Sequence, residues 1–302
     1  MPIYQVIILA IVQGLAELLP VSSSAHVVVA EKLMGLDPSS PQMTLLLVML
    51  HTGTMFAVIA YFWKQWVQTY FASADAFQRF AVRLIWATAL TGVIGESLIK
   101  LVEHTMFKGA PKAEIELLFG RLDLVAPALF CAGVLILIAG LRENKTEAKE
   151  AATTSITRRP SGNVTMQQAG WMGFAQGLAL PFRGFSRSGA TISAGMLAGA
   201  AKERAERFSF ALAVVITPLA IGREALRLVN ATKDAAATGT PIDLHGTLLL
   251  SLLGAVFAFL AGLVALKWLS NWLENGRWYL FGIYCLVASA VVWWLHFGPR
   301  QL

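Results

Sequence analysis

The chain has 302 residues, of which 56% are hydrophobic and 14% are charged, and its mean hydropathy is +0.62. Soluble globular domains carry about 25% charged residues, so this composition argues against an ordinary soluble enzyme and favours an integral membrane protein. The net charge of +6 does not indicate a nucleic-acid partner, because the basic residues are scattered through short connections and do not line one amphipathic face.

The chain begins with an apolar region, residues 3–36, whose middle is interrupted by a proline, several serines and ionisable side chains. A second apolar region, residues 166–200, is interrupted in the same way. Broken backbone at membrane depth is tolerated only where protein or a watery cavity shields it. We therefore interpret both regions as re-entrant broken-helix pairs that mark a site.

Six further stretches of about 20 apolar residues are each long enough to cross a hydrocarbon core of about 30 Å as a helix. They lie at residues 43–63, 80–102, 117–141, 208–228, 244–268 and 278–297. The predicted fold class is an all-α polytopic membrane protein with six transmembrane helices plus the two re-entrant pairs, in a single membrane domain covering residues 1–302.

The two interrupted regions also resemble each other in sequence. Residues 13–16 read Gln-Gly-Leu-Ala and precede a Leu-Pro pair and three serines, and residues 176–179 repeat these four letters before Leu-Pro and Ser-Arg-Ser. Three spans follow each region, so we interpret an internal duplication, with repeat one at about residues 1–141, a polar link at about 142–165 and repeat two at about 166–302. An odd number of spans per repeat predicts inverted topology.

One set of connections is clearly the more basic, which predicts that it is cytoplasmic and that both chain termini lie outside. Its residues are Lys64, Arg79, Arg142, Lys145, Lys149, Arg158, Arg159, Lys202, Arg204, Lys267 and Arg277.

The first interruption combines residue types that suit phosphate chemistry. Glu17 precedes the break, while Ser22, Ser23, Ser24 and His26 open the next half-helix. Free N–H groups at a helix start attract anions, although serines there can equally be plain helix caps. Ser23 and His26 are three residues apart, so the imidazole could take the serine proton, or it could be a structural hydrogen-bond donor. A carboxylate within an apolar segment is a functional candidate by default.

The second interruption contains a guanidinium among hydroxyls and glycines, in the order Ser186, Arg187, Ser188, Gly189 and Thr191. Arginine offers a planar fork that suits phosphate, and glycine lets a ligand approach the backbone closely. This pattern predicts a phosphate-binding segment.

Arg187 and Arg183 each have two possible roles, and His51 has a structural one. Arg187 could form an internal ion pair with Glu17, and both roles hold if the arginine rests on the carboxylate while the site is empty. Arg183 is a second candidate phosphate ligand, unless its side chain extends outward. We interpret His51, in the first span, as a hydrogen-bond partner of a neighbouring helix.

The sequences QGLAELLPVSSSAH at residues 13–26 and GFSRSGATIS at residues 184–193 resemble the two signatures of the undecaprenyl-diphosphate phosphatase family, also called the bacitracin resistance protein family. The resemblance covers essentially the whole chain. It implies hydrolysis of undecaprenyl diphosphate to the monophosphate and inorganic phosphate, which recycles the lipid carrier for cell-wall synthesis and confers bacitracin resistance. It also implies a location in the bacterial inner membrane and a pocket open to the periplasm.

By position, the resemblance implies that Ser23 is the nucleophile, that His26 and Glu17 are base or proton-handling partners, and that Arg187 clamps phosphate. Whether Ser23 forms a phosphoenzyme or His26 activates water directly stays open. The implied phosphate-binding groups are Ser22, Ser24, Ser186, Ser188, Gly189 and Thr191.

The resemblance also implies a divalent cation, Mg²⁺ or Ca²⁺, with Glu17 as a ligand. Gln13 stands where the family usually has a glutamate, so one charged ligand is missing and Gln13 is a doubtful ligand. Gln176 occupies the equivalent place in the second repeat, which suggests a symmetric structural role for both glutamines. Ala25 replaces the family's glycine before the histidine.

The expected partners are a polyprenyl diphosphate substrate and membrane lipids, with a homodimer as a possible assembly. A lipid-phosphate transporter or flippase is the alternative function, because inverted repeats with broken helices are common in transporters. It would use the same anion site but would need no nucleophile.

Overall fold

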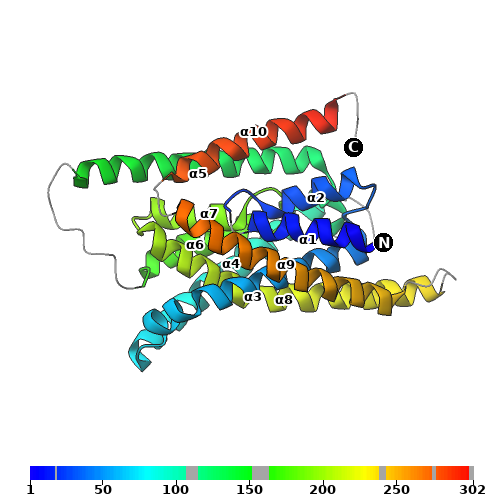
Figure 1. The fold of residues 1–302 in the computed structure, drawn as a ribbon, viewed down its shortest axis with the longest axis horizontal. Helices are drawn as coiled ribbons and strands as arrows, with labels where there is room; N and C mark the ends of the chain where they lie inside the picture. Colours follow the sequence, from blue (N-terminus) through cyan, green and yellow to red (C-terminus); the bar gives the residue numbers. More distant parts are fainter. Residues whose placement is uncertain (18, 107–114, 152–162, 238–242, 274–276, 299–302) are drawn as a thin grey trace.

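The computed structural model describes residues 1–17, 19–106, 115–151, 163–237, 243–273 and 277–298. Within these ranges the regular secondary structure is helical throughout, with ten α-helices and one short 3-10 helix, Ile115–Leu118 (Figure 1). This confirms the all-α fold class.

Six long helices correspond to the six predicted spans, and each contains a segment long and apolar enough to cross a membrane. They are α3 Pro41–Tyr70, α4 Ala74–Met106, α5 Leu122–Ala151, α8 Lys202–Ala237, α9 Leu244–Leu273 and α10 Trp278–Phe297. Helix α10 begins and ends at the predicted residues. The others differ from prediction at one or both ends, because a helix does not stop where its apolar stretch stops.

The predicted polar link is partly helical. Helix α5 continues through residue 151, past the link's expected start at residue 142, and residues 152–162 lie outside the described ranges. The segment 142–151 is rich in Glu, Lys and Ala, which are good helix formers. A polar sequence of this kind can continue a helix.

Both interrupted regions are pairs of short helices. They are α1 Ile3–Glu17 with α2 Ser23–Leu33, and α6 Met166–Ala179 with α7 Arg187–Leu197. Figure 1 shows both pairs between the long helices, in the middle part of the bundle. The helix–break–helix form agrees with the sequence analysis, while the re-entrant course and the inverted relation of the two halves stay predictions.

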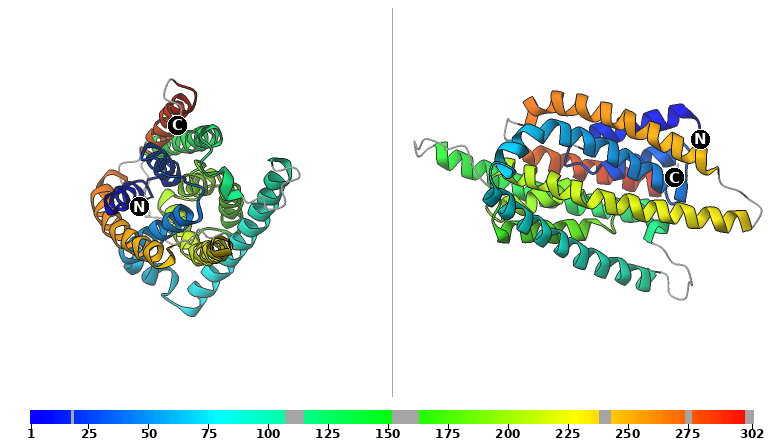
Figure 2. Two further views of the ribbon diagram at one scale, coloured as in Figure 1. Left: turned by 90° about the vertical axis from the view of Figure 1, so that its right-hand side faces the viewer. Right: turned by 90° about the horizontal axis from the view of Figure 1, so that it is seen from below.

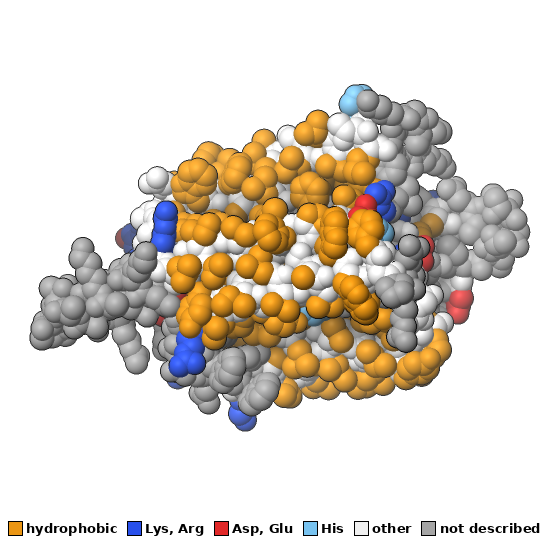
Figure 3. Space-filling view, turned by 90° about the horizontal axis from the view of Figure 1, so that it is seen from above, with side chains coloured by type: hydrophobic (Ala, Val, Ile, Leu, Met, Phe, Trp, Pro, Cys, Tyr) orange, Lys and Arg blue, Asp and Glu red, His pale blue; other side chains and the backbone are white. Residues whose placement is uncertain are grey.

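The outside of the bundle is apolar. Ile85, Leu219 and Val264, on three different long helices, are 68%, 66% and 67% exposed. Figure 3 shows hydrophobic side chains over most of one flank, and Figure 2 shows the long helices running along the long axis of the molecule. Such a surface is unfavourable in water and suits a bilayer. The chain is therefore a multi-pass membrane protein.

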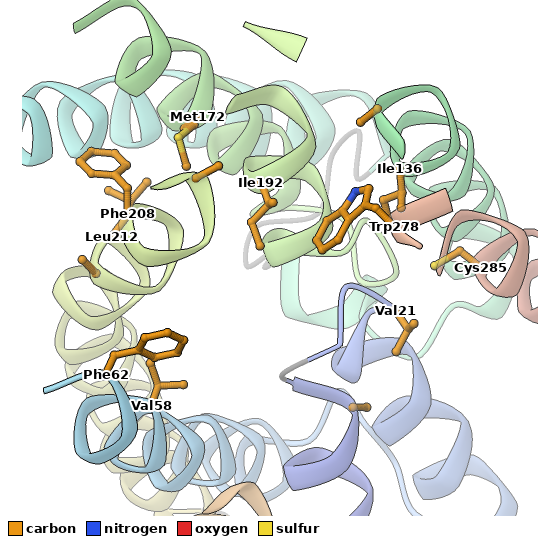
Figure 4. Packing of buried hydrophobic residues seen from close by; sticks show 14 of the residues in the cluster. Val21, Val58, Phe62, Ile136, Met172, Ile192, Phe208, Leu212, Trp278 and Cys285 are labelled. Carbon is orange, nitrogen blue, oxygen red and sulfur yellow. The ribbon is translucent and has the colours of Figure 1, made fainter. Parts of the chain in front are cut away.

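A buried hydrophobic cluster connects the two halves of the chain. Phe62 of α3 stacks on Phe210 of α8, with ring centroids 5.3 Å apart, and within the cluster Trp278 of α10 lies beside Ile136 of α5 (Figure 4). The indole N–H of Trp278 donates a hydrogen bond to the hydroxyl of Ser193 at 3.1 Å. The hydrogen bond ties α10 to α7 within the second half, while the contacts of Phe62 with α8 and of Trp278 with α5 join the two halves of the chain.

Candidate active site

Ser22 starts helix α2 in an unusual backbone conformation. Its φ angle is +66°, in the left-handed region, and its hydroxyl accepts a hydrogen bond from the N–H of Ala25 at 3.4 Å. A non-glycine residue in this region costs of order 1–3 kcal/mol, and such strain gathers at functional sites. The sharp turn makes Ser23 the first residue of α2.

Helix α7 starts in a parallel way. The hydroxyl of Ser186 caps it by accepting a hydrogen bond from the N–H of Gly189 at 3.1 Å, and Arg187 is the first helical residue. Ser23 and Arg187 therefore hold the same position in their helices, as the matched Ser-Ser-Ser and Ser-Arg-Ser segments predict.

The two breaks approach each other closely at Gly189. A Cβ atom there would lie 2.6 Å from Cδ1 of Ile136 and 3.0 Å from the carbonyl oxygen of Pro20. Pro20 belongs to the first break, so the start of α7 packs directly against it. Glycine at 189 permits this approach.

Glu17 lies where the two breaks meet, and its side chain is 9% exposed. The hydroxyl of Ser23 donates to its Oε2 at 2.5 Å, and the amide nitrogen of Gln13 donates to the same oxygen at 2.8 Å. The guanidinium of Arg187 forms an ion pair with Oε1. The structure thus brings together a carboxylate, a hydroxyl that donates a hydrogen bond to it, and a guanidinium that forms an ion pair with it.

His51 of α3 also faces this carboxylate. Its Nε2 lies 3.4 Å from Oε2 of Glu17, and its Nδ1 lies 2.8 Å from the carbonyl oxygen of Leu47. Sequence reasoning assigned His51 only to helix contact and missed its place at the site. The signal was present, because an ionisable side chain in an apolar span is itself a functional candidate.

A small pocket adjoins these groups between α3 and α8. It is lined by Glu17, His51, Thr54, Met55, Val58, Arg187, Phe210, Ala213, Val214 and Thr217. Its polar wall carries the charged groups, and the rest is mainly apolar.

Both ring nitrogens of His26 contact groups other than the Ser23 hydroxyl. Its Nδ1 lies 2.8 Å from the carbonyl oxygen of Ser22, which can only accept, so this nitrogen carries a proton. Its Nε2 accepts a hydrogen bond from the hydroxyl of Tyr284 in α10 at 2.6 Å. The hydroxyl of Ser23 therefore hydrogen-bonds to Glu17, and the contacts of both ring nitrogens of His26 are to Ser22 and Tyr284. Tyr284 gave no signal in the sequence.

The other predicted phosphate-binding hydroxyls lie in different surroundings. Thr191 is fully buried, with its hydroxyl 2.9 Å from the carbonyl oxygen of Arg187 and 2.5 Å from the hydroxyl of Ser209 in α8. Ser24 and Ser188 are partly exposed. Together with the capping roles of Ser22 and Ser186, this leaves Ser24 and Ser188 as the more accessible hydroxyls.

Arg183 lies in a separate environment. Its guanidinium is 4.0 Å from the centre of the Phe119 ring, and it lines a second cavity with Leu124 and Val125 at the start of α5. None of the residues that line this cavity lines the pocket beside Glu17. The two arginines that the sequence offered as phosphate ligands therefore line different cavities.

The donor set around Glu17 suits a weakly held divalent cation. Among the described residues, no three His, Cys, Asp or Glu side chains gather in one place. Glu17 is accompanied by His51 and by Oε1 of Gln13, a fully buried oxygen with no hydrogen-bond partner. Mg²⁺ is commonly bound through one or two carboxylates plus substrate phosphates. These residues fit a cation that takes its remaining ligands from substrate and water.

The fold and the site define a class: a multi-pass α-helical membrane protein with a buried Ser–Glu–Arg site at the junction of two broken helix pairs. The comparison with known families is more specific. Residues 6–291 match the family described as bacitracin resistance protein BacA. The chain belongs to this family.

Individual relatives agree over nearly the full length. A protein of Acinetobacter baylyi named undecaprenyl-diphosphatase 2 is 53% identical over 292 residues, covering 97% of each chain. A protein of Burkholderia thailandensis with the same name is 33% identical over 296 residues, covering 96% of this chain and 95% of its own. Undecaprenyl-diphosphatase 1 of Burkholderia pseudomallei is 33% identical over 300 residues.

Proposed function

We propose that this chain hydrolyses undecaprenyl diphosphate to undecaprenyl phosphate and inorganic phosphate. The observation that carries the proposal is the hydrogen bond from Ser23 to Glu17, with Arg187 on the other carboxylate oxygen, in a member of the BacA family. A lipid diphosphate has an anionic head and a tail that stays in the bilayer. A polar site within an apolar helical bundle fits both parts.

In the first step, Oγ of Ser23 attacks the terminal phosphorus while Glu17 takes the hydroxyl proton. The new bond joins Oγ to phosphorus, the bond from phosphorus to the bridging oxygen breaks, and undecaprenyl phosphate leaves. A carboxylate already bonded to the hydroxyl needs little rearrangement to act as the base.

In the second step, water attacks the phosphoserine and the bond between phosphorus and Oγ breaks. The proton held by Glu17 returns to Ser23, and the water protons leave with inorganic phosphate. The same carboxylate therefore serves both steps and is regenerated.

Arg187 binds the transferring phosphoryl group. In the structure its guanidinium is paired with Glu17, and an incoming phosphate competes for it with a planar, bidentate geometry. Release of Arg187 leaves Glu17 a stronger proton acceptor. A divalent cation, when bound at Glu17, would supply further positive charge against the charge that develops on the phosphoryl oxygens.

We place the protein in the bacterial inner membrane with its site open to the periplasm, where it would recycle the lipid carrier for cell-wall synthesis and confer bacitracin resistance. The concentration of Lys and Arg in one set of connections supports this orientation. Reaction of a membrane-impermeant thiol reagent with a cysteine introduced at Tyr4, which is exposed near the N-terminus, tests it. Labelling from the cytoplasmic side alone would overturn the orientation.

Phosphate release by the purified protein in detergent tests the function. We expect turnover of undecaprenyl diphosphate, and rapid quenching should trap a labelled phosphoenzyme that the Ser23→Ala variant does not form. A Ser23→Ala variant as active as the parent would remove the nucleophile. Absence of turnover in the parent, with any divalent cation supplied, would favour a transporter or flippase.

A further inference from the structure

His51 presents a bare nitrogen to the catalytic carboxylate. Its Nδ1 lies 2.8 Å from the carbonyl oxygen of Leu47, and a carbonyl oxygen can only accept, so Nδ1 carries the proton. In the neutral ring Nε2 then has a lone pair, and this lone pair faces Oε2 of Glu17 at 3.4 Å. Either a proton on Nε2 or a bound cation would supply the positive centre that holds these two electron-rich atoms at this distance.

A metal ion is such a centre, and the spacing fits one. Metal–ligand bonds of about 2.1 Å place neighbouring donor atoms about 3.0 to 3.5 Å apart. Histidines that bind metals also usually donate their other ring N–H to a carbonyl or carboxylate, which fixes the ring. His51 makes this contact to Leu47 within its own helix.

Gln13 offers a third donor. It is fully buried, and its Oε1 has no hydrogen-bond partner, although an unpartnered buried amide oxygen is costly. Its other amide atom is already within 2.8 Å of Oε2 of Glu17. Rotation of the amide by 180° would exchange the two atoms and place Oε1, in place of the nitrogen, next to Oε2 of Glu17.

The remaining contacts of Glu17 are compatible with a cation. A carboxylate oxygen accepts along two lone-pair directions, so Oε2 can keep the hydroxyl of Ser23 and bind a metal as well. Arg187 occupies the other oxygen, Oε1. The positive charge of Arg187 opposes a second cation until a diphosphate arrives, so binding in the empty site is expected to be weak.

We infer that Glu17, His51 and Oε1 of Gln13 form the cation site of this chain. Where the family usually has a glutamate, this chain has Gln13, and the imidazole of His51 replaces the charged ligand that is lost. The inference rests on the proposed function, because it concerns the same catalytic site. An imidazole ligand suits transition metals better than Mg²⁺ or Ca²⁺, whose preferred ligands are oxygens. We therefore expect this site to bind divalent transition-metal ions, Mn²⁺ among them, more tightly than Mg²⁺ or Ca²⁺.

Electron paramagnetic resonance tests the ligand directly, since nitrogen bound to Mn²⁺ modulates the electron spin echo. The probe is Mn²⁺ alone. It is added in detergent to the full-length protein, which carries an affinity tag without histidine. We expect nitrogen modulation in the parent, and binding of Mn²⁺ roughly tenfold or more weaker in His51→Asn. His104→Asn, which changes an exposed histidine at the end of α4, should keep both signals.

His51→Gln provides a second variant that keeps a polar side chain of similar reach. Its oxygen should restore cation binding without the nitrogen signal, and it should move the preference from Mn²⁺ toward Mg²⁺. Nitrogen modulation that persists in both variants, or that is absent from the parent with Mn²⁺ bound, would overturn the inference. In that case His51 pairs with Glu17 as a protonated ring.

These outcomes are separable from the proposed function. A parent that releases phosphate from undecaprenyl diphosphate but shows no nitrogen coupling refutes the His51 site alone. A parent with nitrogen coupling that releases no phosphate refutes the hydrolase assignment and leaves the metal site standing.

Discussion

The hydroxyl of Ser23 donates a hydrogen bond to Oε2 of Glu17 at 2.5 Å, across the break that separates α1 from α2. The two residues are six positions apart in sequence, and only the turn at Ser22 brings them together. The proposed nucleophile and its proposed base therefore lie within one short segment. The second helix pair brings Arg187, the proposed phosphate ligand, to this segment.

This relationship predicts that Ser23 and Glu17 act as a unit. Ser23→Ala and Glu17→Gln should each lower kcat by about 10²- to 10⁴-fold, since each removes one half of the proton transfer. The double variant should be scarcely slower than the slower single variant, because effects within one catalytic unit are not additive. Steady-state phosphate release measures all three, and strictly multiplicative losses would show that the residues act independently.

Arg187→Lys tests the phosphate clamp. Lysine keeps the charge but loses the planar fork, so we expect kcat/KM to fall about tenfold to a hundredfold, with part of the loss in KM. Arg79→Lys, at an exposed position on α4, is the matched control and should behave as the parent. Unchanged kinetics in Arg187→Lys would mean that the arginine acts only as the ion-pair partner of Glu17.

The sequence predicted the fold well and the site in part, for physical reasons. Spans and helix breaks follow from apolar runs, proline and serine, which act locally, so α10 and both helix pairs were located. The apolar stretch predicted a helix end at residue 141, whereas α5 continues to residue 151. A change from apolar to polar residues predicts contact with water, but it does not predict where a helix ends. His51 carried a sequence signal as an ionisable residue in a span, but its contact with Glu17, like that of Tyr284 with His26, depends on packing between helices that the sequence pattern does not specify. For the same reason, the spacing of Ser23 and His26 suggested a pairing that the structure does not form.

Gln13→Glu restores a carboxylate beside Glu17, at the position where the amide nitrogen now donates to Oε2. A second negative charge should tighten divalent-cation activation, lowering the concentration needed for half-maximal activity, and should favour Mg²⁺ or Ca²⁺. Gln176→Glu is the matched control, because Gln176 occupies the equivalent repeat position and is also fully buried. No change in the metal dependence of Gln13→Glu would count against metal binding at this position.

His26 and Tyr284 should show coupled effects on activity, because Nε2 of His26 accepts from the Tyr284 hydroxyl at 2.6 Å. In a cycle of His26→Gln, Tyr284→Phe and the double variant, we expect a coupling free energy of about 0.5–3 kcal/mol. Rates of phosphoenzyme formation and of its breakdown, followed by rapid quenching, show which step the pair serves. Additive losses would indicate that Tyr284 does not support the role of His26.

Gly189→Ala tests the close approach of the two helix breaks. The added methyl group would lie 2.6 Å from Cδ1 of Ile136 and 3.0 Å from the carbonyl oxygen of Pro20, so either the side chain or the backbone must shift. Overpacking of this kind typically costs about 1–3 kcal/mol. We expect a lower midpoint of thermal unfolding in detergent and a reduced kcat, because the shift separates Arg187 from Glu17.

Gly92→Ala is the matched control for this change. Gly92 lies within helix α4, and a Cβ atom there meets no heavy atom within 4 Å. Alanine at an open helical position should be neutral or stabilising by up to about 1 kcal/mol, since glycine is the poorer helix former. Gly189→Ala could instead unfold at the same temperature as Gly92→Ala and keep full activity. That result would show that the contact between the start of α7 and the first break does not determine the position of Arg187 relative to Glu17.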